Sequence, residues 1–298
     1  MTATVTPASA SMIVGTSRAR RTASKPDVPR GRGAVNVVLI IIAILFVVPL
    51  LWLVLSSVDP HATYQTQLPH GLTLQNFADV LNVQTVFLPL LNSLLIGLGV
   101  AIICVVVSVL AAYPLSRYKL RFGSTFLVVV LFSTCLPVTA IMVPVYQLFV
   151  QFNLLDNRFA TVLFLSATAL PTSIFMMKNF MDGVPIDVEE AAWTDGASRL
   201  MALRLIVVPL MRPGIAVVFI FTFIDSWGNF FAPFVLLLSP DKLPLSVSIY
   251  SFFGQNGLIN YGQLAAFSIL YAAPVLGLYI LVSRGIGGSF ALAGAVKG

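Results

Sequence analysis

Six long apolar runs decide what this chain can fold into. They cover roughly Val35–Leu55, Leu90–Ala112, Phe126–Tyr146, Ala160–Met177, Gly214–Leu238 and Leu264–Val282. Runs of about 20 apolar residues match the hydrocarbon thickness of a bilayer when helical. Only 9% of the residues are charged, against about 25% in a soluble domain. Backbone groups in lipid must bond within their own segment, and the period-two alternation of barrel strands is absent. The sequence therefore predicts an all-α membrane protein with six transmembrane helices.

The distribution of Lys and Arg orients these helices. With the N-terminus inside and the spans alternating, the inside segments hold all of the 17 Lys and Arg residues except Arg158 and Lys242. Basic residues accumulate on the cytoplasmic side of membrane proteins, so both termini are expected in the cytoplasm. A cleaved secretory signal fits less well, because the run from Val35 is longer than a signal core and no small-residue cleavage site follows it.

The chain divides by composition into three parts. Residues 1–34 form a basic tail rich in Ser, Ala, Pro and Arg, which has too little apolar content to build a core and is expected to be disordered. Residues 35–285 form the six-helix domain, with a cytoplasmic loop at about 178–213, and residues 286–298 form a cytoplasmic C-terminal tail. The +6 net charge is read as a topology signal, so no nucleic-acid partner is expected.

Enzyme chemistry and cofactors are not expected on this chain. His61 and His70 stand nine residues apart without nearby Cys or clustered acids, which argues against a metal site. Cys104 and Cys135 lie inside predicted spans, where lone cysteines act as small apolar residues. There is no Gly-rich phosphate loop with a following Lys-Ser or Lys-Thr, and no nucleophile with a plausible base. The sequence therefore predicts no catalytic, cofactor-binding or metal-binding residue.

One acidic residue lies inside a predicted span. Asp225 stands in "FTFIDSWGNFFAPF" with Trp227 and Asn229 shortly after it. Charged residues at such depth usually face a cavity or a partner, and Asp225 and Asn229 are spaced to share a helix face. A carboxylate and an amide can bond hydroxyl groups, and an aromatic ring can stack on a sugar, so these three residues are the candidate substrate path. A polar contact between neighbouring helices is the alternative. Asn92-Ser93 is read only as a helix start near the interface.

The loop at 178–213 holds a compact acidic stretch, "VPIDVEEAAWTDGAS", with four of the eleven acids of the chain. Asp187 is predicted to cap a short helix, with Glu190 three residues on as in a capping box. Gly196 suits a left-handed helix stop, and Ser198 can cap a second helix that ends near Pro209. The alternative is an ordinary solvated helical hairpin.

The same loop resembles the signature of ABC-importer permeases. That pattern is Glu-Ala-Ala, three residues, Gly, nine residues, Ile, one residue, an apolar residue and Pro. The chain supplies it with Val where Leu is usual, at Glu190, Ala191, Ala192, Gly196, Ile206, Val208 and Pro209. "LTLQNFADVL" (Leu72–Leu81), the "NSL" that follows at Asn92–Leu94, and the terminal "AGAVKG" are similar to the maltose and multiple-sugar importer family, the binding-protein-dependent carbohydrate permeases. The resemblance runs from the first span to the last residue.

This resemblance implies a type I ABC importer permease fold in the cell (plasma or inner) membrane, surrounded by lipid. It implies a second permease subunit in a heterodimer, two copies of an ABC ATPase, and an extracytoplasmic sugar-binding protein. The loop helix would dock in a groove of the ATPase, and the chain's last residues, Val296–Gly298, would reach toward it. The residues expected to couple to the ATPase are Glu190, Ala191, Ala192, Asp195, Gly196, Ile206 and Pro209.

Other functions remain open on the sequence alone. An ABC permease for a non-sugar polar solute would share the loop, although the "AGAVKG" end favours sugar. A secondary transporter would need ion-coupling acids in the spans and inverted repeats, for which Asp225 is the only support. A membrane enzyme would need clustered titratable residues at one membrane face. The sequence does not name the sugar, which depends on a pocket shared with the partner permease.

Overall fold

The computed structural model describes residues 32–65, 68–69, 71–253 and 259–295. The chain divides into two units, Met1–Pro49 and Leu50–Gly298, and each is described by itself. What is described of the first unit is the beginning of α1 (Arg32–Ser57), a helix with Pro49 in its interior. Most of the predicted basic tail, and Val296–Gly298, lie outside the described residues. Apart from the length of α1, the structural features below belong to the second unit.

The membrane-length helices fit the predicted six-span fold. Among the described residues, four helices are long and apolar enough to cross a membrane: Val35–Ser57, Val83–Arg117, Arg158–Asp182 and Tyr261–Arg284. The second joins the π-helical turn η1 (Val83–Phe87) to α3 (Leu88–Arg117), the third is α6 (Arg158–Asp182), and the fourth belongs to α13 (Tyr261–Ala295). Two bent pairs complete the set when each is counted as one span, giving up to six. Helix α13 continues past residue 285 to Ala295.

The first bent pair joins α4 (Gly123–Ser133) to α5 (Val138–Gln151) through a 90° bend. The span predicted at Phe126–Tyr146 therefore contains a sharp bend. Pro137 lacks the backbone N–H that a continuing helix needs, and the hydroxyls of Ser133 and Thr134 donate to the carbonyls of Val130 and Leu131. These local bonds satisfy the end of α4 and let the chain turn.

The second bent pair joins the segment Arg199–Leu210 to α10 (Arg212–Gly228) at an angle of 77°. The predicted fifth span ran to Leu238, but its last ten residues do not continue the helix. Helix α10 ends at Gly228, because Asn229 is extended (φ −72°, ψ 111°). The Asn229 side chain then accepts a hydrogen bond from the Ala232 amide and so starts a separate helix, α11 (Phe231–Leu236).

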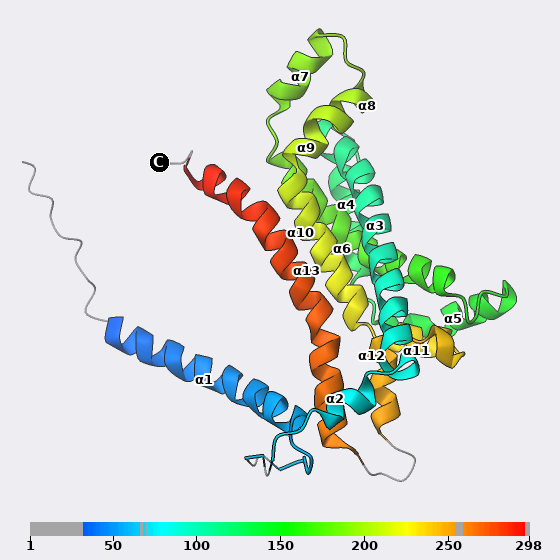
Figure 1. Ribbon diagram of the computed structural model, residues 1–298. Coiled ribbons are helices and arrows are strands. Elements are labelled where there is room, and N and C mark those ends of the chain that lie inside the picture. The colour runs from blue at the N-terminus through cyan, green and yellow to red at the C-terminus, as the bar shows by residue number, and fades with distance from the viewer. Residues whose placement is uncertain (1–31, 66–67, 70, 254–258, 296–298) are drawn as a thin grey trace, which may run out of the picture. The chain divides into compact units, whose positions relative to one another are not determined.

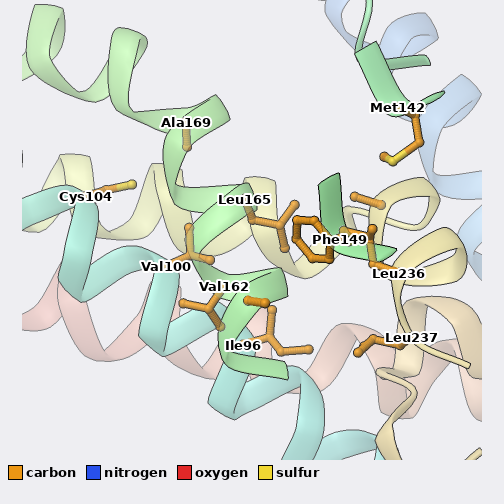
Figure 2. Close-up of a cluster of buried hydrophobic side chains, with 12 residues drawn as sticks. Ile96, Val100, Cys104, Met142, Phe149, Val162, Leu165, Ala169, Leu236 and Leu237 are labelled. Atoms are coloured by element: carbon orange, nitrogen blue, oxygen red, sulfur yellow. The ribbon is translucent and has the colours of Figure 1, made fainter. Parts of the chain in front are cut away.

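Helices α3, α6 and α10 form the centre of the bundle (Figure 1). One apolar cluster packs Ile96, Val100 and Cys104 of α3 against Leu165 and Ala169 of α6, and it continues to Met142, Phe149 and Leu236 from α5 and α11 (Figure 2). Helix α10 meets α6 closely at Gly214, where a Cβ atom would lie 2.5 Å from the Phe180 ring. Small residues permit such close approach in membrane bundles, where van der Waals packing drives association.

The two ends of the bundle carry different elements (Figure 1). The α7 end holds α7 (Ile186–Thr194), α8 (Arg199–Ala202), the π turn η2 (Leu203–Val207) and α9 (Val208–Leu210). The α11 end holds α2 (Gln75–Val80), α11, η3 (Pro240–Lys242), α12 (Leu245–Ser248) and η4 (Ile249–Phe252).

Two buried asparagines fasten the α11 end. Asn76 of α2 donates to the carbonyls of Ser57 and Asp59, at 3.1 and 3.0 Å. Asn92 of α3 is fully buried and donates to the carbonyls of Asp241 and Leu243, at 2.9 and 3.0 Å. The reading of Asn92 as a helix start was wrong, since the helical segment begins at Val83. Most buried polar groups are hydrogen-bonded, and the side-chain nitrogens of these two residues bond backbone carbonyls at least 17 positions away in sequence.

Candidate functional site

Helix α7 ends in the way predicted from Gly196. The Gly196 φ angle is +90°, in the region that favours glycine. Its amide donates to the Trp193 carbonyl at 3.1 Å, and the Ala197 amide donates to the Ala192 carbonyl at 3.0 Å. This pair of bonds is the Schellman arrangement that closes a helix and reverses the chain. Ser198 then accepts a hydrogen bond from the Met201 amide and caps α8, as predicted.

The start of α7 differs from the prediction. Asp187 does not cap the helix, because the N-cap is Pro185 and no side chain bonds the first amides. The capping box with Glu190 is therefore absent. Asp187 and Glu189 instead lie in the first turn, where negative charge suits the positive end of the helix dipole. Proline fixes the extended conformation just before the helix, so the turn forms without a side-chain cap.

A buried ion pair anchors α7 to the end of α3. Arg117 Nε donates to Glu189 Oε1 at 2.5 Å, with the two side chains 5% and 0% exposed. Arg117 Nη2 also donates to the Val184 carbonyl at 3.1 Å. Glu189 Oε2 is buried and receives no hydrogen bond from the described residues. Removing one partner of such a pair leaves an uncompensated buried charge and costs about 3–5 kcal/mol. Sequence reading missed this pair, because it assigned Arg117 to topology alone.

Three consecutive residues at the end of α3, Ser116, Arg117 and Tyr118, make side-chain bonds to the segments around α7. Beside Arg117, Ser116 donates to the Asp182 carboxylate at 2.6 Å at the end of α6. Tyr118 follows directly after α3, and its hydroxyl accepts from Arg199 of α8 at 2.9 Å, with the guanidinium 5.2 Å from the ring centre. The end of α3 thus contacts the segments before, within and after α7.

The predicted coupling residues divide into exposed and supporting groups. Glu190, Ala191, Asp195 and Gly196 are exposed, Ala192 is buried, and Ile206 and Pro209 are partly buried. Large apolar side chains lie exposed on the same loop, at Val188, Leu200, Met201 and Leu205. An acidic and apolar surface on a firmly anchored short helix is suited to docking a partner protein.

The comparison with known families decides the class of this chain. Residues 104–286, which include the whole α7 loop, match the family described as "Binding-protein-dependent transport system inner membrane component". The chain belongs to this permease family. It is an inner-membrane transport component rather than an enzyme, and the ABC-importer resemblance of the loop at Glu190–Pro209 is confirmed at the level of the family.

Curated relatives and a solved structure agree with this assignment. The permease is 30% identical to an inner membrane ABC transporter permease of Escherichia coli K12, YcjP, over 79% of this chain and 84% of that one. It is 30% identical to the diacetylchitobiose uptake permease NgcG of Streptomyces coelicolor, over 85% of each chain. It is 29% identical to the maltodextrin permease MdxG of Bacillus subtilis, over 83% and 89%. A chain in the crystal structure of a bacterial alginate-importing ABC transporter shares the fold, with TM-score 0.73, 22% identity and coverage of 85% and 95%.

The predicted substrate-path residues of the permease do not lie together on one surface. Asp225 is exposed. Trp227 is buried, with its ring centre 5.4 Å from that of Phe223, on which it stacks. Its ring also lies against the Tyr271 ring, and the Tyr271 hydroxyl donates to the Trp227 backbone carbonyl. Asn229 lies beyond the end of α10, so the shared helix face predicted for it and Asp225 was wrong. Asp225 stays a predicted path residue, while Trp227 and Asn229 have structural contacts within the subunit.

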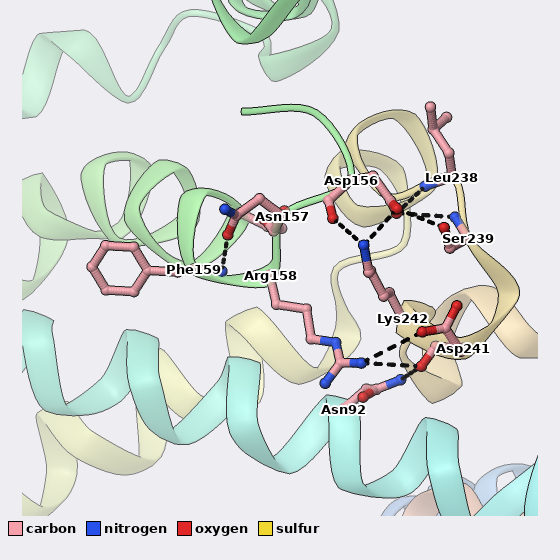
Figure 3. A network of polar contacts seen from close by, with 10 residues as sticks. Asn92, Asp156, Asn157, Arg158, Phe159, Leu238, Ser239, Asp241 and Lys242 are labelled. Atoms are coloured by element: carbon pink, nitrogen blue, oxygen red, sulfur yellow. Dashed lines mark hydrogen bonds and ion pairs between the residues drawn. The ribbon is translucent and has the colours of Figure 1, made fainter. Parts of the chain in front are cut away.

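The α11 end also contains a polar network that was not predicted from the sequence (Figure 3). Asp156 accepts from Lys242 Nζ at 2.6 Å, from the Ser239 hydroxyl at 2.5 Å, and from the amides of Leu238 and Ser239 at 3.0 Å. Lys242, followed by Ser239, holds the pKa of the Asp156 carboxyl well below its ordinary value. Arg158 adds a 3.3 Å bond to the Asp241 carbonyl. The network ties the start of α6 to the segment between α11 and α12.

Proposed function

We propose that this permease imports a carbohydrate and forms half of its translocation pathway. Three relatives from different bacteria carry names that specify uptake or transport of carbohydrates or a sugar derivative: diacetylchitobiose, maltodextrin and sulfoquinovosyl glycerol. The agreement among these names, at 28–30% identity over most of this chain, carries the proposal.

The partners follow from the same proposal. A second permease subunit completes the pathway in a heterodimer, two copies of an ABC ATPase lie beneath, and an extracytoplasmic binding protein delivers the sugar. The α7 end then faces the cytoplasm with both termini, and the α11 end faces outward. The distribution of Lys and Arg supports this orientation.

Helix α7 is the part of the permease proposed to meet the ATPase. Its outer surface offers Glu190, Ala191 and Asp195, with the exposed apolar residues of the loop around them. Its inner side is fixed to α3 through Glu189 and Arg117. Closure of the ATPase dimer would move α7, and the buried ion pair would carry that movement into α3 and the bundle.

Co-purification tests the proposed assembly. The affinity-tagged permease, expressed with its neighbouring genes and extracted in mild detergent, should retain a second permease and an ATPase at a ratio of two ATPases to one heterodimer. Sugar-loaded binding protein should then stimulate ATP hydrolysis by the complex. Stoichiometry comes from quantitative mass spectrometry. A permease that purifies without an ATPase, and takes up solute on an ion gradient alone, would contradict the proposal in favour of a secondary transporter.

A further inference from the structure

A cavity of about 530 Å³ lies at the α11 end of the permease. This volume is in the range of ordinary small-molecule sites. Its walls come from four separate segments, namely η1, α11, the chain around η3, and α12 with η4. It is distinct from the predicted path residue Asp225, which does not line it.

The polar part of the wall is uncharged. Gln84 and Thr85 of η1 line the cavity, and none of the hydrogen bonds among the described residues involves either side chain. Ser248 and Ser251 also line it, and their hydroxyls donate to the carbonyls of Pro244 and Ser248, which leaves oxygen lone pairs to accept bonds. None of the lining residues is Asp, Glu, Lys, Arg or His. Such a wall suits a neutral ligand with many hydroxyl groups.

Aromatic rings supply the apolar part of the binding surface. Phe234 and Tyr250 line the cavity with ring centres 6.2 Å apart, and their side chains are 47% and 61% exposed. Phe230 stacks on Phe234 at 5.0 Å, and Phe253 lies 6.3 Å from Tyr250. These four rings form a row along the α11 end. Contiguous exposed apolar surface of this kind marks a place where something binds.

Hydrogen bonds from other parts of the subunit fix backbone groups in the segments that form the cavity wall. The amides of Leu238 and Ser239 are fixed by Asp156, and the Leu243 carbonyl is fixed by buried Asn92. The hydroxyl of Ser93 accepts from the Leu245 amide at 2.8 Å. A site held by such supporting bonds loses little conformational freedom when a ligand binds.

We propose that this cavity is an entry site for a neutral oligosaccharide at the outer mouth of the permease. The apolar C–H face of a sugar ring would stack on Tyr250 and Phe234, and its hydroxyls would bond Gln84 and Thr85. The inference rests on the proposed function, because it takes the α11 end as the outward-facing one. It places a first sugar contact before the membrane-embedded path.

The test measures direct sugar binding by the purified transporter complex without its binding protein. Saturation-transfer difference NMR with maltotriose and with diacetylchitobiose should detect at least one of them on the wild-type complex. Tyr250→Ala and Gln84→Ala should each weaken binding of that sugar at least tenfold, and Tyr250→Phe should retain it within about threefold. Tyr64→Ala is the matched control, since Tyr64 is exposed and does not line the cavity; it should bind as wild type.

Two results would overturn the inference. One is equal sugar binding in Tyr250→Ala and wild type. The other is absence of direct binding of both sugars to the wild-type complex. If Tyr250→Ala then impairs the stimulation of ATP hydrolysis by binding protein, the aromatic row is a protein contact. The proposed function is scored separately, by ATP-driven uptake of the two sugars into proteoliposomes. If uptake occurs and the cavity variants have no effect on binding, the entry site is wrong and the proposed function stands. If neither these two sugars nor any other sugar of a carbohydrate panel is taken up with ATP, the proposed function is wrong.

Discussion

Replacing Arg117 by Met should lower ATP-driven uptake at least tenfold while the permease still inserts and assembles in the membrane. The change leaves Glu189, which is 0% exposed, as an unpaired buried carboxylate, at a cost of about 3–5 kcal/mol. The loop can relieve this cost by releasing α7 from α3, and about 1.4 kcal/mol corresponds to a tenfold change in population. Glu189→Met should act in the same way, by leaving the Arg117 guanidinium buried. Uptake and the amount of assembled complex are measured together.

A double variant separates the anchor from a general loss of stability. Replacing both Arg117 and Glu189 by Met removes the two charges together and substitutes apolar groups of similar length, a change that is often neutral in buried pairs. The double variant should therefore recover much of the uptake that either single variant loses. Arg121→Met is the matched control, since Arg121 is an exposed arginine four residues along, near the Phe122 ring. Wild-type uptake in both single variants would show that this ion pair does not hold α7 in its working position.

Three substitutions at Gly196 should distinguish the effect of backbone strain in the loop from the effect of a changed surface on ATPase docking. A Cβ at φ +90° meets no atom within 4 Å, so Gly196→Ala introduces only the strain of the left-handed region, about 1–2 kcal/mol. Gly196→Asn should be milder, because asparagine tolerates this region better than other residues. Gly196→Asp adds negative charge to a surface that already carries Glu190 and Asp195. We expect the Gly196→Asp variant to lose ATPase association or sugar-stimulated ATP hydrolysis. The Gly196→Ala variant should lose part of that activity, and the Gly196→Asn variant should stay close to wild type.

The readouts for this series are ATPase co-purification and the hydrolysis rate with loaded binding protein. Sugar binding by the separate binding protein serves as the internal control, since it should not change. Equal behaviour of Gly196→Asp and Gly196→Asn in both assays would mean that the exposed surface of α7 does not touch the ATPase.

In the α7 loop, contacts between neighbouring residues could be predicted from the sequence, whereas contacts between distant residues could not. The Gly196 stop and the Ser198 cap were predicted because both depend on bonds within a few residues. The Asp187 cap was wrong, because the helix begins at Ile186 with Pro185 as its N-cap, two residues earlier than an Asp187 cap would place it. The pairing of Arg117 with Glu189 joins residues 72 positions apart, and no local pattern reveals such a contact. Glu190, given the leading role from the family motif, is exposed, while its neighbour Glu189 makes the structural bond.

In the membrane spans, too, some features could be predicted from the sequence and others could not. Hydrophobic length predicted the four long helices and the two apolar regions that form bent pairs, because the bilayer imposes that length on any helix that crosses it. It did not predict the 90° break between α4 and α5 or the end of α10 at Gly228. Those features depend on one proline, two hydroxyls and the Asn229 side chain, which redirect single backbone bonds. Trp227 was read as a sugar platform because its ring type fits, yet Phe223 and Tyr271 cover it in the fold.

The most direct measurement of the central claim is sugar uptake by the complete complex in proteoliposomes. The vesicles hold ATP and Mg²⁺ inside, with sugar-loaded binding protein and radiolabelled maltotriose or diacetylchitobiose outside. Sugar should accumulate only when ATP, the binding protein and this permease are all present, and accumulation should fall at least tenfold with Arg117→Met. Uptake of equal size without ATP, driven by an imposed proton or sodium gradient, would contradict that claim.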